Sequence, residues 1–160
     1  MQALVAVDSN WGIAKDGQIP WKWPEDLLFF KDKTLNKRII VGRKTFETLP
    51  KLKNRTILCL TRQNLEKSNW YDHLSNTAFG QINIYEAQSL HLQNDVFVCG
   101  GEEVYRELLR YCDTVWVSQR FEDYKCDKFF PKDILDDIFV KSQSIAMDGG
   151  TIHRYDYVPF

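Results

Sequence analysis

Two short apolar runs that each end in glycine constrain the fold of this chain more than any other feature. They are Arg38-Ile39-Ile40-Val41-Gly42 and Val96-Phe97-Val98-Cys99-Gly100. Neither run alternates between apolar and polar residues, so each is expected to form a strand that is covered on both faces. A helical stretch is predicted after each run, which is typical of parallel strands joined by helices. The sequence therefore predicts an α/β fold with a central, mostly parallel sheet.

The other elements complete this prediction. Strands are expected at 2–8, 38–42, 56–61, 82–85, 95–99, 114–119, 138–144 and 152–158. The last two are separated by Asp148-Gly149-Gly150 and should form an antiparallel hairpin that closes the sheet edge. Helices are expected at 24–34, 43–49 and 102–111, the first of them with proline at its first position.

Three segments are harder to assign. The stretch 9–23 contains Gly12, Gly17 and Pro20 and is expected to be a long loop, which in compact domains is often functional. Residues 63–81 give no clear element, and residues 86–94 are too short for a full crossover helix. No repeat or linker divides the chain, so residues 1–160 are expected to form one domain.

Composition excludes several classes of function. The formal net charge of −1 gives no electrostatic reason to expect nucleic acid or an anionic membrane as the main partner. No apolar run approaches the roughly 18 residues of a membrane span, and the start does not resemble a signal peptide. The four cysteines show no CxxC pairing or histidine spacing, so we expect unpaired thiols in a reducing cytoplasm and no metal site.

The predicted helix at 24–34 carries an acid among apolar residues. Asp26 and Phe30 are four residues apart and share a helix face, and Leu27 lies beside them. One interpretation is structural, because first-turn acids such as Glu25 and Asp26 are stabilised by the helix dipole. The other is that Asp26 is a buried functional carboxylate, which needs a hydrogen-bond partner. The helix pattern alone favours the structural interpretation, and other evidence is needed for a functional Asp26.

Two strand-to-helix junctions have the character of phosphate sites. One is Gly42-Arg43-Lys44-Thr45 and the other is Gly100-Gly101, which precedes Val104 and Tyr105. Backbone N–H groups at a helix start bind phosphate, and glycine allows a close approach. Ligands of open α/β sheets bind outside the carboxyl ends of the strands, where both junctions are expected. A nucleotide site is therefore predicted there.

An ordered set of motifs resembles the dihydrofolate reductase family. The set consists of Pro20-Trp21, Pro24-x-Asp26-Leu27-x-x-Phe30, Thr34-Leu35-Asn36-Lys37, Ile40-Val41-Gly42-Arg43-Lys44-Thr45-Phe46-Glu47-Thr48-Leu49-Pro50, Arg55, Leu60-Thr61-Arg62, Val98-Cys99-Gly100-Gly101 with Val104-Tyr105, and Asp127 with Phe130-Pro131. Each fragment alone is weak, but the order and spacing are specific and cover essentially the whole chain.

The resemblance implies the family's single-domain fold, with an eight-stranded sheet flanked by helices, and a monomeric NADPH-dependent oxidoreductase. It would reduce 7,8-dihydrofolate to 5,6,7,8-tetrahydrofolate by hydride transfer to C6 and protonation at N5, which supports one-carbon and thymidylate metabolism. The implied catalytic residues are Asp26, Trp21 and Ser118. Asp26 would bind the 2-amino group and N3 of the pterin as a bidentate carboxylate. Burial would raise the pKa of Asp26 and the helix N-terminus would lower it.

The resemblance also implies the residues that bind the substrate, or an antifolate in its place. They are Leu4, Ala6, Asp26, Leu27, Phe30, Leu49, Leu52, Arg55, Cys99, Tyr105 and Ser118. Arg55 would pair with the α-carboxylate of the glutamate tail, because an arginine fork matches a carboxylate. Without the family match, Arg55 would read as a surface arginine.

The implied NADPH-binding residues cluster at the two junctions. They are Ala6, Ile13, Gly42, Arg43, Lys44, Thr45, Leu60, Thr61, Arg62, Gln63, Cys99, Gly100, Gly101, Glu102, Glu103, Val104 and Tyr105. Arg43, Lys44 and Arg62 would surround a 2′-phosphate, whereas a site for NADH would more commonly place an acid there. In the family the Gly100-Gly101 peptide is cis.

The chain departs from the family pattern at three positions. Ala14 stands where glycine is usual, which puts the kinetics of loop closure in doubt. Glu102 stands where a small residue is common, and its carboxylate would repel a pyrophosphate unless it turns away. Cys126 stands in a loop position often held by glycine, beside Asp127, which in relatives contacts the active-site loop.

Two alternatives remain at this point. A pyrimidine reductase of riboflavin biosynthesis shares the fold and the cofactor but would lack the Trp21 to Asp26 signature. A non-catalytic nucleotide-binding domain of the same architecture would have lost the acid or the glycine pair.

Overall fold

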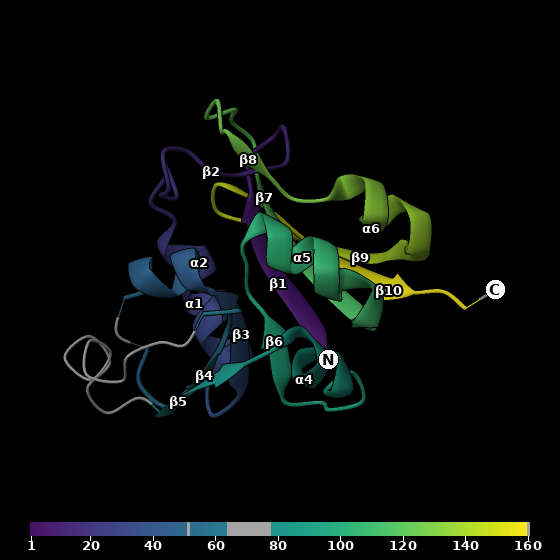
Figure 1. Cartoon of the computed structure of the whole chain (residues 1–160). Coiled ribbons are helices and arrows are strands. Elements are labelled where there is room, and N and C mark those ends of the chain that lie inside the picture. The colour runs from purple at the N-terminus through teal and green to yellow at the C-terminus, as the bar shows by residue number, and fades with distance from the viewer. Residues whose placement is uncertain (51, 64–77, 160) are drawn as a thin grey trace.

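The computed structural model describes residues 1–50, 52–63 and 78–159 and shows one eight-stranded sheet in the order β5-β4-β3-β6-β1-β7-β10-β9 (Figure 1). The strands are β1 (Gln2–Val7), β3 (Arg38–Gly42), β4 (Thr56–Leu60), β5 (Ala78–Ile82), β6 (Val96–Val98), β7 (Thr114–Arg120), β9 (Phe139–Met147) and β10 (Gly150–Tyr157). Neighbours from β5 to β7 are parallel, whereas β10 is antiparallel to both β7 and β9. The predicted parallel sheet with an antiparallel C-terminal hairpin is confirmed.

The two apolar runs are neighbouring strands at the centre of the sheet. Strand β3 pairs with β6 in parallel, and Ile39, Ile40 and Val41 are completely buried. Such residues stabilise the fold by about 25 cal/mol for each Å² of apolar surface that they remove from water. These runs therefore lack alternation because both faces of the two strands are covered, as we expected.

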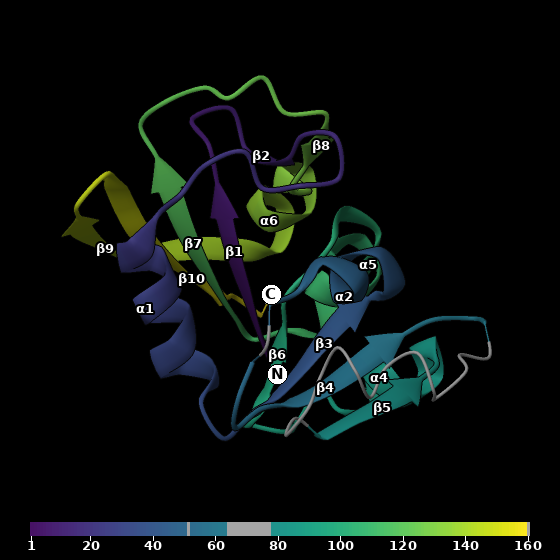
Figure 2. The same cartoon turned by 90° about the vertical axis from the view of Figure 1, so that its left-hand side faces the viewer.

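Helices cover the sheet on both faces (Figure 2). Helices α1 (Pro24–Thr34) and α2 (Arg43–Thr48) pack on one face through Phe29, Phe30 and Phe46. Helices α4 (Ile84–Ser89), α5 (Glu102–Leu108) and α6 (Lys132–Ile138) and the 3₁₀ helix η1 (Leu109–Tyr111) pack on the other. No helix among the described residues is long and apolar enough to cross a membrane.

Alternation along β1 assigns its side chains to the two faces. Ala3, Val5 and Val7 belong to the core beneath α5 and α6, and Leu4 belongs to the core beneath α1 and α2. We call the first the α5 face and the second the α1 face.

The strand predicted at 82–85 is wrong. Strand β5 ends at Ile82, and Asn83 caps helix α4, which takes up the next residues. The Asn83 side chain accepts from Glu86 N at 2.8 Å, and the Glu86 carboxylate accepts from Asn83 N at 3.1 Å. This reciprocal capping box marks a helix start. The segment 86–94 accordingly begins with the last four residues of α4.

Two other boundaries differ. The predicted helix 102–111 is α5 followed by η1, and the predicted loop 9–23 contains a short strand, β2 (Gly12–Ala14). Strand β2 pairs with β8 (Lys128–Phe129), so two loops distant in sequence lie side by side near the end of β1 (Figures 1 and 2). Within 63–81, Trp70 and Tyr71 lie outside the described residues.

Candidate active site

Asp26 lies in the first turn of α1 and faces β7. Pro24 is at the start of the helix, and Phe29 and Phe30 pack it onto the α1 face. Burial raises the pKa of Asp26 to about 6, and a hydrogen bond with the Ser118 side chain opposes part of that increase. Burial is thus the larger of these two influences on the pKa of Asp26. A first-turn acid that served only the helix dipole would stay exposed, as Glu25 does.

Leu27 does not contribute to the burial of Asp26 as we expected. Its side chain is 64% exposed, because a neighbour in a helix is rotated by about 100° and leaves the face that Asp26 and Phe30 share. Its contact with the substrate stays a prediction.

The floor of the site is formed by β1 and β7. Leu4 and Ala6 of β1 pair in register with Trp116 and Ser118 of β7, so these four side chains point to the α1 face. Ser118 is 2% exposed. The sheet thus places the Ser118 side chain next to Asp26.

Five of the predicted substrate residues share one apolar cluster on the α1 face. Leu4 and Leu52 are buried members of the core on the α1 face, and Phe30, Leu49 and Cys99 pack against it half-buried. The buried Tyr105 donates to the backbone carbonyl of Leu4, and its desolvation raises its pKa well above the usual value. The folded chain therefore gathers the predicted apolar wall around one end of β1.

Arg55 is buried and held from two sides. Its Nε donates to the Thr34 hydroxyl at 3.2 Å, and its Nη1 donates to the carbonyl of Lys53 at 2.8 Å. Burial lowers the pKa of its guanidinium. The interpretation as an ordinary surface arginine is therefore wrong, because a buried cation needs such partners.

The two glycine junctions lie side by side at the carboxyl ends of β3 and β6. Gly42 N donates to the carbonyl of Gly100 at 2.9 Å, and the peptide between Gly100 and Gly101 is cis. A Cβ on Gly101 would lie 3.2 Å from Thr45 Oγ1, and one on Gly42 would lie 3.0 Å from Val104 Cγ2. The backbones of the two junctions can approach this closely only without side chains.

These junctions fit a phosphate-bearing cofactor. Neither α2 nor α5 has a side-chain cap at its N-terminus, so the first N–H groups of both helices have no acceptor from a capping side chain. The residues that follow β3 and β4 add positive charge, with Arg43 and Lys44 after one strand and Arg62 after its neighbour. Backbone donors and cations at one sheet edge suit a dinucleotide.

Two sets of contacts involve residues of this positively charged sheet edge. Arg43 forms an exposed ion pair of 3.3 Å with Glu47. The Thr61 hydroxyl accepts from Gln63 N at 3.1 Å, and the carbonyl of Gln63 accepts from the Gln81 side chain. The turn after β4 is thus ordered by its own residues.

Glu102 turns its carboxylate toward a loop. Its Oε1 accepts from the backbone N–H of Phe129 in β8 at 3.4 Å. The repulsion that we expected between Glu102 and a pyrophosphate is reduced, because the charge points along the loop between β7 and β8. Glu103 is exposed.

The loop at 9–20 is tied to the loop before β8. Asp16 N donates to the Asp127 carboxylate at 3.0 Å, and Asp127 N donates to the carbonyl of Ala14 at 2.9 Å. The expected contact of Asp127 with this loop is confirmed. Ile13 and Leu60 pack half-buried against the core on the α5 face.

Asp8 also ties these loops together, and sequence reasoning missed it. Its completely buried carboxylate accepts from the N–H groups of Asn10, Gly12 and Tyr124 at 2.8 to 2.9 Å. An acid at the end of an apolar strand, four residues before a glycine, is the signal that could have identified it.

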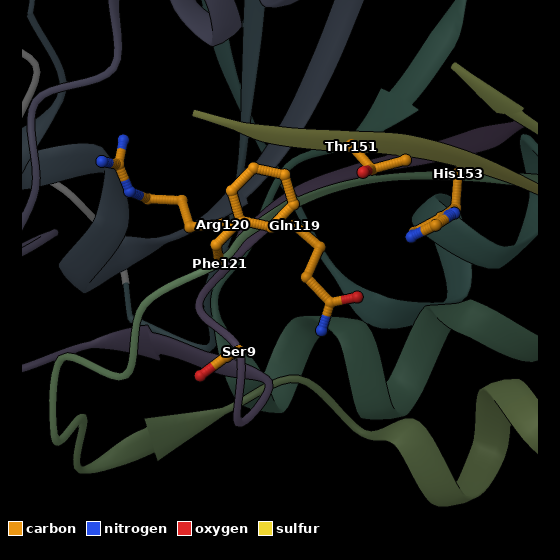
Figure 3. A pocket seen from close by; sticks show the side chains of 6 residues that line it. All are labelled: Ser9, Gln119, Arg120, Phe121, Thr151 and His153. Carbon is orange, nitrogen blue, oxygen red and sulfur yellow. The ribbon is translucent and has the colours of Figure 1, made fainter. Parts of the chain in front are cut away.

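A cavity of about 240 Å³ lies elsewhere, at the other side of β7 and β10 (Figure 3). It is lined by Ser9, Gln119, Arg120, Phe121, Thr151 and His153. Gln119 and Thr151 are register partners, one residue away from the pair Ser118 and Ile152 that faces α1. They therefore point to the α5 face, so this cavity is not the site of Asp26.

Comparison with known proteins agrees with this geometry. Residues 1–159 match the family model described as Dihydrofolate reductase. The chain is 31% identical over 157 residues to the dihydrofolate reductase of Mycoplasma genitalium, covering 96% of this chain and 95% of that protein. It is 34% identical over 146 residues to the bifunctional dihydrofolate reductase-thymidylate synthase of Daucus carota, of which it spans 28%.

A solved structure shows the same fold. The dihydrofolate reductase from Enterococcus faecalis, complexed with NADP(H) and RAB-propyl, superposes with a TM-score of 0.79 at 27% identity. The match covers 98% of this chain and 95% of that one.

Proposed function

This chain belongs to the dihydrofolate reductase family, and we propose that it reduces 7,8-dihydrofolate to 5,6,7,8-tetrahydrofolate with NADPH. The observation that carries the proposal is the pair of Asp26 and Ser118. It places a carboxyl group with a pKa of about 6 and a hydroxyl against an apolar wall. Neither the pyrimidine reductase nor a non-catalytic domain requires this arrangement.

The Asp26 carboxylate binds the 2-amino group and N3 of the substrate's pterin ring. An ionised carboxylate accepts two parallel hydrogen bonds from an N–H pair, which fixes the plane and the direction of the pterin ring. Because the carboxylate is desolvated, each bond is stronger than it would be in water. Ser118 hydrogen-bonds Asp26 from β7 and orients it.

Asp26 acts on the proton at N5 indirectly. The carboxylate contacts the far edge of the ring, so it raises the basicity of N5 through the ring and water delivers the proton. Trp21 precedes the helix of Asp26 and covers the pterin, and Arg55 pairs with the glutamate tail. The apolar wall of Leu49 and Leu52 excludes water around the aminobenzoyl group.

The glycine junctions hold NADPH. When bound there, NADPH supplies the hydride for C6. The N–H groups at the starts of α2 and α5 bind its phosphates, and Arg43, Lys44 and Arg62 bind the 2′-phosphate with Thr61. In this proposal Ala6 of β1 and Ile13 of β2 contact the nicotinamide, and Ala14 belongs to the loop that closes over it.

Asp26→Asn tests the proposal, with Glu25→Gln as its matched control on the same helix turn. We expect Asp26→Asn to lower kcat/KM for dihydrofolate at neutral pH by about 100-fold or more, the usual contribution of a positioned acid or base. Glu25→Gln should stay within about twofold, because Glu25 is exposed. Near-wild-type turnover of Asp26→Asn would contradict the role of Asp26.

The decisive assay is dihydrofolate-dependent oxidation of NADPH by the purified chain. No activity, together with no binding of a diaminopyrimidine antifolate, would overturn the proposed function. We further propose a single-domain, monomeric and cytoplasmic enzyme. Light scattering of the purified protein would reveal a dimer if the monomer proposal is wrong.

A further inference from the structure

Three aromatic rings and one guanidinium group form a chain of contacts beside the start of α1. The ring of Trp21 lies 5.2 Å from that of Tyr124, tilted by 55°. The guanidinium carbon of Arg120 lies 5.4 Å from the centre of the Tyr124 ring and 5.1 Å from the centre of the Trp23 ring. We call Trp21, Tyr124, Arg120 and Trp23 the Arg120 stack.

Arg120 interacts mainly with the two rings. Its side chain is 12% exposed, and among the described residues its buried Nε has no hydrogen-bond partner. Its other contacts are long, at 3.5 Å to the carbonyl of Lys22 and 3.7 Å to the carboxylate of Glu122. The negative face of an aromatic ring attracts a desolvated cation, so the two rings offset part of the cost of burying the charge.

The stack lies on the face of the sheet that carries Asp26. Arg120 pairs in register with Gly150, two residues along β7 from Ser118. Figure 3 shows its side chain extending away from Gln119, Thr151 and His153. The side chain therefore leaves the cavity of the α5 face and reaches the segment before α1.

Trp23 anchors one end of the stack. It is 4% exposed, and its Nε1 donates to the carbonyl of Asp148 at 2.6 Å. A Cβ on Gly150 would lie 2.8 Å from Trp23 Cη2, so the indole packs directly on that backbone. Trp23 is also the N-cap residue of α1, which has no side-chain cap. Ring packing thus fixes the start of the helix of Asp26.

Tyr124 is fixed by its own loop. Its N–H donates to the buried Asp8 carboxylate at 2.9 Å, and its hydroxyl donates to Glu122 at 3.0 Å. Trp21 forms no side-chain hydrogen bond within the described part of the chain, and its ring contacts Tyr124. The position of the Trp21 ring therefore depends on Tyr124, which is held by its own loop and contacted by the Arg120 guanidinium.

We infer that Tyr124 and Arg120 are positioning residues that fix the Trp21 ring over the reacting pterin. The inference rests on the proposed function, in which Trp21 covers the pterin. Loss of the Tyr124 ring leaves Trp21 free to rotate. This slows hydride transfer, because a misplacement of about 1 Å can cost up to 100-fold in rate. Cofactor binding is unaffected, since the cofactor junctions lie at β3 and β6.

The test compares Tyr124→Leu with Tyr124→Phe by single-turnover hydride transfer. We expect Tyr124→Leu to lower the transfer rate about tenfold with the KM for NADPH unchanged. Tyr124→Phe keeps the ring and should stay within about twofold. Arg120→Met, which removes the cation but keeps the length, should lower the rate about threefold, and Arg120→Lys should restore part of it. An equal loss in Tyr124→Phe and Tyr124→Leu would overturn the inference.

A double-mutant cycle with Trp21→Leu separates positioning from a general structural effect. If Tyr124 acts through Trp21, adding Tyr124→Leu to Trp21→Leu should change the rate less than twofold. If the rate losses of Tyr124→Leu and Trp21→Leu multiply in full in the double variant, the inference is wrong. The proposed function would still stand, provided that the wild-type protein reduces dihydrofolate. Near-ultraviolet circular dichroism should lose the Trp21 and Tyr124 contribution in Tyr124→Leu and keep it in Tyr124→Phe. A wild-type protein without dihydrofolate reduction would instead overturn the proposed function, and this inference with it.

Discussion

Gly12 and Cys126 are packed so closely that position 12 has no room for a side chain. A Cβ on Gly12 would lie 2.3 Å from Cys126 Cβ and 2.6 Å from Cys126 Sγ. The Cys126 thiol is desolvated and hydrogen-bonded to the Asp8 carboxylate, which together raise its pKa to about 11. Cys126 is therefore part of the contact between the two loops.

Gly12→Ala should displace one loop from the other. We expect a loss of about 1–3 kcal/mol in the free energy of unfolding, typical of overpacking, and slower hydride transfer. Replacing Cys126 by glycine removes both clashing atoms. The double variant with Gly12→Ala and Cys126→Gly should thus recover most of both losses in urea unfolding and single-turnover kinetics. A double variant as impaired as Gly12→Ala alone would show that the clash lies elsewhere.

Asp26→Asn should stabilise the fold at neutral pH while it lowers activity. The pKa of Asp26 is raised from 3.8 to about 6, so between these values the folded chain binds more protons than the unfolded chain. Stability therefore falls as the pH rises through this window. A shift of about two units corresponds to about 3 kcal/mol at most, and partial exposure reduces the expected gain in Asp26→Asn to about 1–2 kcal/mol.

Urea unfolding of both proteins at pH 4 and pH 7.5 measures this effect. The gain of Asp26→Asn over the wild type should be largest at pH 7.5 and shrink toward pH 4. Glu25→Gln, one residue earlier and exposed, should show no such dependence. A gain that is equal at the two pH values would contradict the burial of an ionisable Asp26.

The sheet was predictable because its central strands are unusual in sequence. Runs such as Ile39-Ile40-Val41 have no polar face, and only central strands tolerate that. The wrong prediction of a strand at 82–85 arose because strand and helix signals overlap in this segment. Ile82 and Ile84 suggest a strand, but the hydrogen bonds between Asn83 and Glu86 start a helix between them. The capping hydrogen bonds of Asn83 and Glu86 therefore determine that a helix starts here, although the apolar residues favour a strand.

The sequence predicted several residues that the fold brings together around Asp26, but less of their surroundings. The pairing of Asp26 with Ser118 followed from the family resemblance, yet the exposure of Leu27 depends on where the helix meets the sheet. Asp8 was missed because one of its partners, the N–H of Tyr124, lies 116 residues away and is a backbone group. No residue type at position 124 would have signalled that contact.

Arg43→Ala and Arg62→Ala should raise the KM for NADPH much more than that for NADH. A 2′-phosphate gains charge-assisted hydrogen bonds from these cations that a 2′-hydroxyl does not, worth about 1.5–3 kcal/mol each. Arg106→Ala is the matched control, because Arg106 pairs with Asp133 on the α5 face. Glu47→Gln should lower the KM for NADPH slightly, since it frees Arg43 from its ion pair. Equal effects of the arginine changes on both cofactors would contradict the assignment.

Arg55→Lys should weaken binding of the glutamate tail of the substrate without affecting binding of its pterin ring. Lysine keeps the charge but lacks the fork that binds a carboxylate through two bonds, so the KM for dihydrofolate should rise about tenfold or more. A dihydropterin without the glutamate tail should be reduced equally well by both proteins. Thr34→Val removes the hydroxyl that accepts from Arg55 Nε and leaves that buried donor unpaired. It should raise the same KM by about threefold to tenfold, and a similar rise for the tail-less substrate would show that Arg55 supports the fold and not the tail.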